Sequence, residues 1–274
     1  MKKLQFLMLN LVLIIFSHTA RGEVLVLVHG WAADASTWQR SGVLPILQSA
    51  GWRDSGVVVS SPSGAQLFSS PYPVQSSKHV YRVELPSNGP LLLQASHLIS
   101  QLAFIQGQHP EEAMTLAGHS SGGVVARLAV IKPEYVKIHS LITIASPNLG
   151  TPRALDGLAV VDSKPDFCPG PGIYFLKTVL GGNQYQYLKA SRGSMTDLQP
   201  AAPGSLLDWL NRQPHPPIRY HAVIRGQGDD LVPAASQDLN QVSAIQGKAH
   251  RYLTPSGHAL SAADGQLLLD ILSN

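Results

Sequence analysis

A serine near the middle of the chain lies in a pattern that can support nucleophilic chemistry. Residues 118–122 read Gly-His-Ser-Ser-Gly, which matches G-x-S-x-G with Ser120 at its centre. A serine hydroxyl is a weak nucleophile, so it needs a base to take its proton and a carboxylate to orient that base. Where this pattern occurs at a turn from a strand into a helix, the carboxylate and then the histidine follow it along the chain. The pattern therefore predicts an acid and a histidine after Ser120.

Two other interpretations apply to this segment. Ser120 could be a helix N-cap beside a glycine-rich turn, because a serine at the start of a helix accepts a backbone N–H bond. Ser121 could be the nucleophile only if the motif were shifted out of register. We favour Ser120, since residues 114–117 predict a strand directly before the motif and residues 121–131 predict a helix directly after it.

Two acids and two histidines are candidates for the remaining roles. Asp229 and Asp230 follow an expected strand at 219–225, and either acid could orient the base from there. We predict that His258 is the base, because it lies in a loop between the last expected strand and the last expected helix; the alternative is an ordinary exposed loop histidine. His250 is the second candidate, but it lies at the start of a strand, where a parallel sheet has structural rather than catalytic residues.

The residues after the first expected strand are placed to help form an oxyanion hole. These are His29, Gly30 and Trp31. The backbone N–H groups of Trp31 and Ser121 are the predicted donors, since amides about 3 Å from the developing oxyanion stabilise a tetrahedral intermediate. We expect the His29 side chain to brace the loop by hydrogen bonding, and His119 is a further supporting candidate. The Trp31 indole is either a core aromatic or a substrate contact.

The elements expected around these residues alternate between strands and helices. Short apolar, β-branched runs predict strands at 23–28, 57–59, 80–85, 114–117, 139–144, 219–225 and 251–254. Apolar residues at helical spacing predict helices at 36–50, 91–105, 121–131 and 261–272. This alternation predicts an α/β fold with a mostly parallel, doubly wound sheet and helices on both faces. Ligand sites in such folds lie beyond the carboxyl ends of the strands, which is where the motif residues occur.

Two segments interrupt the alternation. Residues 60–77 are rich in Ser, Pro and Gly, and we expect a loop or hairpin there. Residues 147–213 are rich in Gly and Pro, lack a strand signal and contain only short candidate helices at 173–179 and 205–210. We expect this second segment to be an insertion over the sheet.

Composition favours one large globular domain. The chain has 274 residues, of which 44% are hydrophobic and 14% charged, so it has ample material for a buried core. Lys and Arg number 20 against 17 Asp and Glu, and no basic run is longer than Lys2-Lys3. A nucleic-acid-binding surface would need a clustered basic patch, so we expect no nucleic-acid partner. The single cysteine, Cys168, cannot form an intrachain disulfide and is expected to be structural.

The first residues have the pattern of an export signal. Lys2-Lys3 provides a positive start, residues 4–16 are almost wholly apolar, and small residues at 17–20 suit cleavage. A membrane anchor is the less favoured alternative, because a helix needs roughly 20 residues to span a bilayer. We therefore predict a signal peptide at 1–22, a single domain at 23–274, and export to the periplasm or the medium.

Taken together, the motifs resemble the bacterial lipase and esterase branch of the α/β-hydrolases, including the group similar to GPI-inositol deacylases. The resemblance rests, in family order, on Val-His-Gly at 28–30, Gly-His-Ser-Ser-Gly at 118–122, Ile-Ala-Ser-Pro-Asn-Leu-Gly-Thr-Pro at 144–152, Asp229 with Val232-Pro233, and His258. It implies the α/β-hydrolase fold, a cap or lid at about 147–213, and Asp229 rather than Asp230 as the orienting acid.

The chain departs from the family pattern at two places. Asn148 replaces the His of the usual Ser-Pro-His-x-Gly segment, which leaves the three predicted catalytic residues untouched. Residues 60–77 are additional to the usual path from the first helix to the strand at 80–85, and they either shape the substrate entrance or extend one edge of the sheet.

The resemblance implies a serine hydrolase that cleaves carboxylic esters, with a small-molecule acyl or lipid ester as substrate and transient contact with a lipid surface. Ser120 would attack the carbonyl, His258 would carry the proton and Asp229 would orient the imidazole, with no cofactor and no metal. A thioesterase or an acyltransferase would use the same residues. A catalytically silent member of the fold that acts as a binding protein is the alternative from another class, and such a protein usually lacks one of the three residues.

Overall fold

The computed structural model describes residues 22–70, 75–132, 136–162, 185–226 and 228–273. Apart from Gly22, the predicted signal peptide lies outside the described residues. Cys168 and the helix expected at 173–179 also lie outside them. None of the helices in the described part of the chain has both the length and the apolar character needed to cross a membrane.

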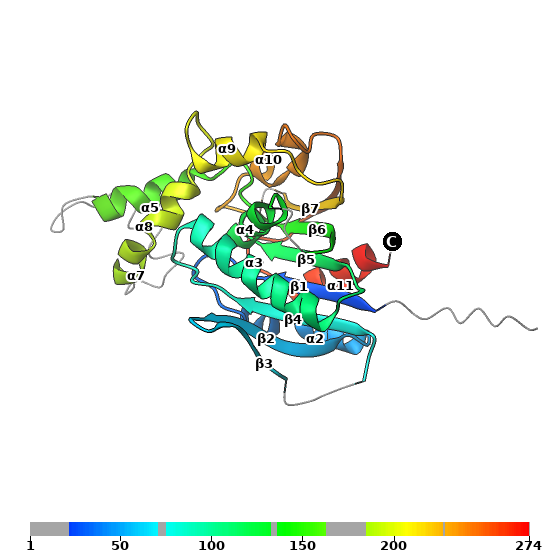
Figure 1. Cartoon of the computed structure of the whole chain (residues 1–274). Coiled ribbons are helices and arrows are strands. Elements are labelled where there is room, and N and C mark those ends of the chain that lie inside the picture. The colour runs from blue at the N-terminus through cyan, green and yellow to red at the C-terminus, as the bar shows by residue number, and fades with distance from the viewer. Residues whose placement is uncertain (1–21, 71–74, 133–135, 163–184, 227, 274) are drawn as a thin grey trace, which may run out of the picture.

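An eight-stranded sheet forms the centre of the molecule (Figure 1). In chain order its strands are Glu23–Val28 (β1), Arg53–Ser61 (β2), Gly64–Phe68 (β3), Lys78–Glu84 (β4), Met114–His119 (β5), Ile138–Ile144 (β6), Arg219–Arg225 (β7) and Ala249–Thr254 (β8). They are ordered β3-β2-β4-β1-β5-β6-β7-β8, and every neighbouring pair is parallel except β2 and β3. The predicted mostly parallel sheet is confirmed, and the carboxyl ends of its central strands meet at one edge.

Helices cover both faces of the sheet, as expected for a doubly wound fold. On one face lie Leu91–Gln108 (α3) and Ser121–Val130 (α4), which share a hydrophobic core with inward residues of β1 and β5. On the other face lie Val43–Ser49 (α2) and Ala262–Leu272 (α11), which pack in a second core. Strands buried between two such layers require apolar side chains on both faces, which explains the continuous apolar run of β1.

The helix expected at 36–50 is instead two helices, Thr37–Arg40 (α1) and Val43–Ser49 (α2). The break is at Gly42, which has a left-handed φ of 84°. A Cβ atom at this position would lie 3.2 Å from the Cβ of Ala262, at the start of α11. The prediction of one continuous helix was wrong because Gly42 takes a left-handed backbone conformation, which interrupts the helix and which the spacing of apolar residues does not report.

The segment at 60–77 forms part of a hairpin at the edge of the sheet. Strand β2 runs on to Ser61, the chain turns, and β3 returns antiparallel to it as the terminal strand. No described residue of this segment lines the cavity that contains Ser120. From the sequence, this segment could either shape the substrate entrance or extend one edge of the sheet. Its described residues extend the sheet edge.

Between β6 and β7 the described chain contains helices and no strand. These helices are Pro152–Asp162 (α5), Tyr185–Ala190 (α7), Arg192–Asp197 (α8) and Leu206–Arg212 (α9), of which the last corresponds to the short helix expected at 205–210. In Figure 1, α5, α7 and α8 lie together to one side of the sheet. The short helices Ala234–Gln237 (α10) and Leu239–Gln241 (η1) follow β7.

Candidate active site

Ser120 occupies a sharp turn between β5 and α4. Its backbone has φ 53° and ψ −131°, a conformation that non-glycine residues rarely adopt and that the surroundings must impose. The flanking glycines permit it: a Cβ on Gly122 would lie 2.3 Å from the carbonyl oxygen of His29, and a Cβ on Gly118 would lie 2.5 Å from the Cα of Gly123. The motif glycines are therefore needed for the close approach of β1 and α4 to this turn.

His258 connects Ser120 to Asp229. Its Nε2 atom lies 2.9 Å from Ser120 Oγ, and its Nδ1 atom lies 2.8 Å from Asp229 Oδ2. An ionised carboxylate only accepts hydrogen bonds, so Nδ1 carries the proton and Nε2 is left to accept the serine hydroxyl. The structure thus brings together Ser120 and two residues that follow it by more than a hundred positions, in an arrangement that allows the imidazole to take the serine proton.

Asp229 is fixed by hydrogen bonds to both carboxylate oxygens. The backbone N–H groups of Leu231 and Val232 each donate to Oδ1 over 2.9 Å, and Gln237 Nε2 donates to Oδ2 over 3.0 Å. Burial acts to raise the pKa of this carboxyl, but the hydrogen bond and charge of His258, with the two backbone donors, hold the pKa below its usual value. Asp229 is therefore ionised at neutral pH.

The other candidate acid and the other candidate base do not contact His258 or Ser120 through any hydrogen bond of the described residues. Asp230 is exposed and lines the cavity, and its carbonyl oxygen accepts a hydrogen bond from Arg153 Nε over 2.9 Å. His250 is in β8, where its ring stacks on His221 at a centroid distance of 5.3 Å. Of the two alternatives for each role, the structure brings Asp229 and His258 to Ser120.

His119 supports the loop that contains His258. Its Nε2 atom donates to the carbonyl oxygen of His258 over 2.8 Å, and the two rings lie 5.2 Å apart. Burial, with the neighbouring imidazole, lowers the pKa of His119 to about 3. It is therefore neutral at physiological pH and holds the His258 backbone without placing a second charge beside it.

The loop at residues 30–35 passes close to the nucleophile. A Cβ on Gly30 would lie 2.8 Å from Ser120 Cβ, so only glycine fits there. The His29 ring braces the loop as predicted, because Nδ1 donates to the Gly30 carbonyl over 3.0 Å and Nε2 accepts from the Leu85 N–H over 3.1 Å. Trp31 lines the cavity and its ring lies 6.0 Å from that of Tyr187.

Ser121, the alternative nucleophile, is the first residue of α4. Its Oγ atom is buried and makes no hydrogen bond within the described part of the chain, whereas His258 contacts Ser120. The first N–H groups of a helix have no partner within the helix and point outward from its end. Because Ser121 is the first residue of α4, its backbone N–H group lies at the turn that contains Ser120.

A cavity of about 610 Å³ opens over Ser120 and His258. Its walls come from five parts of the fold: the loop at 30–35, helix α1 with the residue after it, the segment between β6 and β7, the loop after β7 and the loop after β8. Most of the lining surface is apolar, and the charged lining residues are Arg40, Arg153 and Asp230. A concave, largely apolar site with a few convergent polar groups is typical of a small-molecule binding site.

Sequence reasoning missed a buried polar network behind Asp229. Arg127 in α4 is fully buried and donates to Asn148 Oδ1 over 3.3 Å and to Asn211 Oδ1 over 2.8 Å. Asn148 in turn donates from Nδ2 to the carbonyl oxygen of Gln237 over 3.1 Å. The residue that replaces the usual family histidine therefore supports the segment that holds Asp229. Gln237 is the last residue of α10, a helix of four residues, which is too short for a periodic signal to mark a buried polar residue.

Within the described residues, no group of three or more His, Cys, Asp or Glu side chains is arranged to hold a metal ion. The prediction of no metal remains an expectation for the chain as a whole.

Comparison with known proteins agrees with this fold. A model of the alpha/beta hydrolase family matches residues 25–270. A GPI inositol-deacylase from Debaryomyces hansenii is 40% identical over 74 residues, which make up 24% of this chain and 7% of that protein. The match thus spans a small part of that relative's length.

Two solved structures show how widely this fold is used. The mature lipase BlEst2 from Bacillus licheniformis superposes with a TM-score of 0.60 at 16% identity, covering 93% of this chain and 91% of that one. A bromoperoxidase from Bacillus anthracis superposes with a TM-score of 0.56 at 16% identity, covering 92% of each chain. At this level of identity the likeness concerns the fold, and the reaction must be argued from the site itself.

Proposed function

Because the chain belongs to the α/β-hydrolase family, we propose that it is a serine hydrolase that cleaves carboxylic esters through an acyl-enzyme. The observation that carries this proposal is the continuous hydrogen-bonded path from Asp229 Oδ2 through His258 to Ser120 Oγ, at the base of an apolar cavity. Each partner has the environment that its role requires: a buried ionised acid, an oriented imidazole and a serine exposed to the cavity.

In the first half of the reaction, Ser120 Oγ attacks the ester carbonyl while His258 Nε2 takes the hydroxyl proton. The tetrahedral intermediate carries its negative charge on the former carbonyl oxygen, for which the amides of Trp31 and Ser121 are the proposed donors. When the intermediate collapses, the C–O bond to the alcohol breaks and His258 gives its proton to the leaving oxygen. Ser120 then carries the acyl group.

In the second half, water replaces the alcohol. His258 removes a proton from the water as it attacks the acyl carbonyl, and the collapse of the second intermediate returns the proton to Ser120 and releases the carboxylic acid. Asp229 remains ionised throughout and stabilises the imidazolium. These reaction steps need no redox chemistry and no cofactor.

We propose that the cavity binds the acyl part of the substrate and that this part carries a hydrocarbon chain. The lining contributed by Ala154, Met195, Leu198 and Val232 favours burial of CH₂ groups, each worth about 0.8 kcal/mol. Ala154 lies in α5 and Met195 in α8, so the helices between β6 and β7 form one wall, as a cap over the acyl site would.

Labelling with a fluorophosphonate probe tests the proposal. Wild-type protein should take the label at Ser120, and Ser120→Ala and His258→Ala should both lose it. A series of p-nitrophenyl esters of increasing length then tests the acyl site, and matched thioesters and alcohol acceptors separate ester hydrolysis from thioesterase and acyltransferase activity. Folded wild-type protein that takes no label would contradict the proposal and favour a binding protein.

We further propose that the protein is exported. The proposal rests on the positive start at Lys2-Lys3 and the apolar residues 4–16. Mass spectrometry of the mature N-terminus tests it: cleavage near residue 22 is expected, and an intact leader would favour a membrane-tethered form.

A further inference from the structure

The loop at 30–35, here called the oxyanion loop, has a backbone that must be held in place from outside. Ala32 has φ 55°, a left-handed conformation that is unfavourable for a residue with a Cβ atom. Such conformations persist only where the surroundings over-determine them. Because the Trp31 amide precedes Ala32 directly, any relaxation of this strained turn would move the proposed oxyanion donor.

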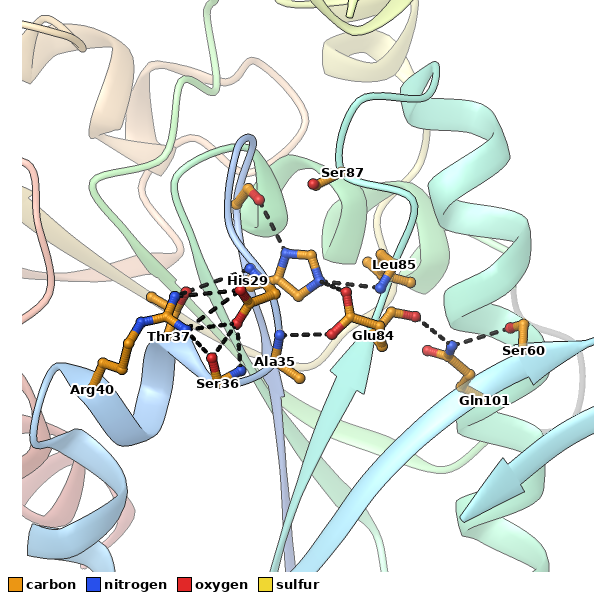
Figure 2. Close-up of polar contacts among 12 residues, drawn as sticks. His29, Ala35, Ser36, Thr37, Arg40, Ser60, Glu84, Leu85, Ser87 and Gln101 are labelled. Atoms are coloured by element: carbon orange, nitrogen blue, oxygen red, sulfur yellow. Dashed lines mark hydrogen bonds and ion pairs between the residues drawn. The ribbon is translucent and has the colours of Figure 1, made fainter. Parts of the chain in front are cut away.

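Both ends of the oxyanion loop are anchored to the carboxyl end of β4. At the entry, the Leu85 N–H donates to His29 Nε2 over 3.1 Å. At the exit, the Ala35 N–H donates to Glu84 Oε2 over 2.8 Å. Figure 2 shows both contacts, with the Glu84 carboxylate lying between the His29 ring and Ala35. Adjacent residues of one strand end thus fix the two ends of a loop from a different part of the chain.

Glu84 is itself held firmly. Gln101 in α3, which is fully buried, donates from Nε2 to the Glu84 carbonyl oxygen over 2.8 Å and to Ser60 Oγ over 3.1 Å. The other Glu84 carboxylate oxygen, Oε1, lies 3.7 Å from His29 Nε2. Gln101 therefore fixes the backbone of Glu84, and the hydrogen bond from the Ala35 N–H holds its carboxylate beside the loop.

The chain that follows Glu84 contacts the proposed cap. Ser87 Oγ lies 2.9 Å from the hydroxyl of Tyr187 in α7, and the Leu91 N–H donates to Asp197 Oδ2 in α8 over 2.8 Å. The ring of Tyr187 also contacts that of Trp31. The connection between β4 and α3 is therefore a common support for the oxyanion loop and the cap helices.

From these contacts we propose that Glu84 is a positioning residue for the oxyanion hole; this inference rests on the proposed function. Glu84 does not line the cavity and so acts through the loop rather than on substrate. Its carboxylate accepts the Ala35 N–H, fixes the end of the strained turn and thereby keeps the Trp31 amide directed at the developing oxyanion. The contribution is made in the transition state, where charge develops on the substrate oxygen.

Three variants test this role. Glu84→Ala removes the acceptor, and Glu84→Gln keeps an oxygen that can accept the Ala35 N–H. Glu23→Gln is the matched control, because Glu23 is a half-exposed carboxylate at the amino end of β1 whose ion pair is with Lys78. For each protein we would measure kcat and KM with a p-nitrophenyl ester, inhibition by a trifluoromethyl ketone, and hydrogen exchange of the peptide covering residues 29–40.

Glu84→Ala should lower kcat by about 10- to 100-fold with KM changed less than about twofold, because complete loss of one oxyanion donor costs about 10²- to 10³-fold. Inhibition by the ketone, which mimics the tetrahedral intermediate, should weaken in parallel. Exchange in residues 29–40 should become faster, while the peptide around Ser120 stays protected. Glu84→Gln should keep most of the activity, and Glu23→Gln all of it.

Two results would overturn the inference. One is a Glu84→Ala protein with wild-type kcat and wild-type exchange in the loop; the other is a Glu84→Ala protein whose loop exchanges faster without any change in kcat or ketone inhibition. Wild-type protein without esterase activity or fluorophosphonate labelling would instead contradict the proposed function, and the exchange measurement would still report whether Glu84 holds the loop. The two failures are therefore distinguishable.

Discussion

Gln237 Nε2 donates to Oδ2 of Asp229 over 3.0 Å, and this is the same carboxylate oxygen that faces His258 Nδ1. Gln237 is fully buried, and its other hydrogen bonds lead from Nε2 to the Val232 carbonyl and from the Arg225 N–H to Oε1. One amide side chain thus ties the end of β7 to the loop that contains Asp229. The orientation of the carboxylate depends on this contact as well as on His258.

Gln237→Leu should weaken both catalysis and stability. It removes a hydrogen bond to a charged group and leaves the buried Arg225 N–H without its acceptor, which together should cost about 2 to 4 kcal/mol of unfolding free energy. Without the Gln237 hydrogen bond, Asp229 orients His258 less well in the transition state. We expect this to raise the activation free energy by about 1.4 kcal/mol, which lowers kcat about 10-fold. Urea unfolding and ester kinetics would measure the two effects. Gln241→Ala, at an exposed position in η1, should change neither.

The two neighbouring acids should respond very differently to the same substitution. Asp229→Asn keeps the shape of the side chain but removes the charge that fixes the proton on His258 Nδ1, so kcat should fall on the order of 10³- to 10⁴-fold. Asp230→Asn, at an exposed position, should leave kcat within about twofold. Equal effects on ester kinetics would show that the orienting acid has been assigned wrongly.

The features that the sequence predicts well are those with strong local signals. The apolar run of β1, the turn at Ser120 and the loop position of His258 each follow from neighbouring residues. The signal weakens where polar residues enter a strand. We predicted β2 only at 57–59, but it begins at Arg53, because Asp54 is paired with Arg82 on β4 and the chain bulges before Gly56.

Residues that act through distant contacts leave no comparable signal. Glu84 contacts Ala35 across 49 positions, and Arg127 contacts Asn211 across 84 positions. A polar side chain at such a site looks like any surface residue, because its partner is set by the packing of elements far along the chain. Arg127 is the clearest case, since burial lowers its pKa to about 9 and its side-chain partners within the described residues are neutral.

Gly30→Ala should damage the site more than the fold. The added Cβ would lie 2.8 Å from Ser120 Cβ and 2.9 Å from the His119 carbonyl oxygen, so the oxyanion loop and the nucleophile turn must move apart. A displacement of about 1 Å at a reacting centre can cost about 10²-fold in rate, and we expect a loss of at least that size in kcat/KM.

The matched substitution is Gly107→Ala, in α3. Nothing lies within 4 Å of a Cβ at that position, and alanine has the higher helix propensity. This variant should keep full activity and unfold with a free energy equal to or up to about 1 kcal/mol above that of wild type. If Gly30→Ala were as active as Gly107→Ala, the close approach of the loop to Ser120 would have no role in catalysis.

Acidification should destabilise the fold through its buried histidines. Burial lowers the pKa of His119 to about 3 and the pKa values of His215 and His221 to about 4, against 6.5 for an ordinary histidine. The folded state therefore binds fewer protons than the unfolded state between these values, so the free energy of unfolding is highest above about pH 6.5 and falls as the pH drops toward 4.

Urea unfolding at intervals from pH 7.5 to pH 4.5 would measure how steeply the unfolding free energy depends on pH. His221→Gln should reduce this slope by removing one of the three groups. A slope that is unchanged in the variant, or an unfolding free energy independent of pH in the wild type, would show that these rings are protonated as readily in the fold as in the unfolded chain.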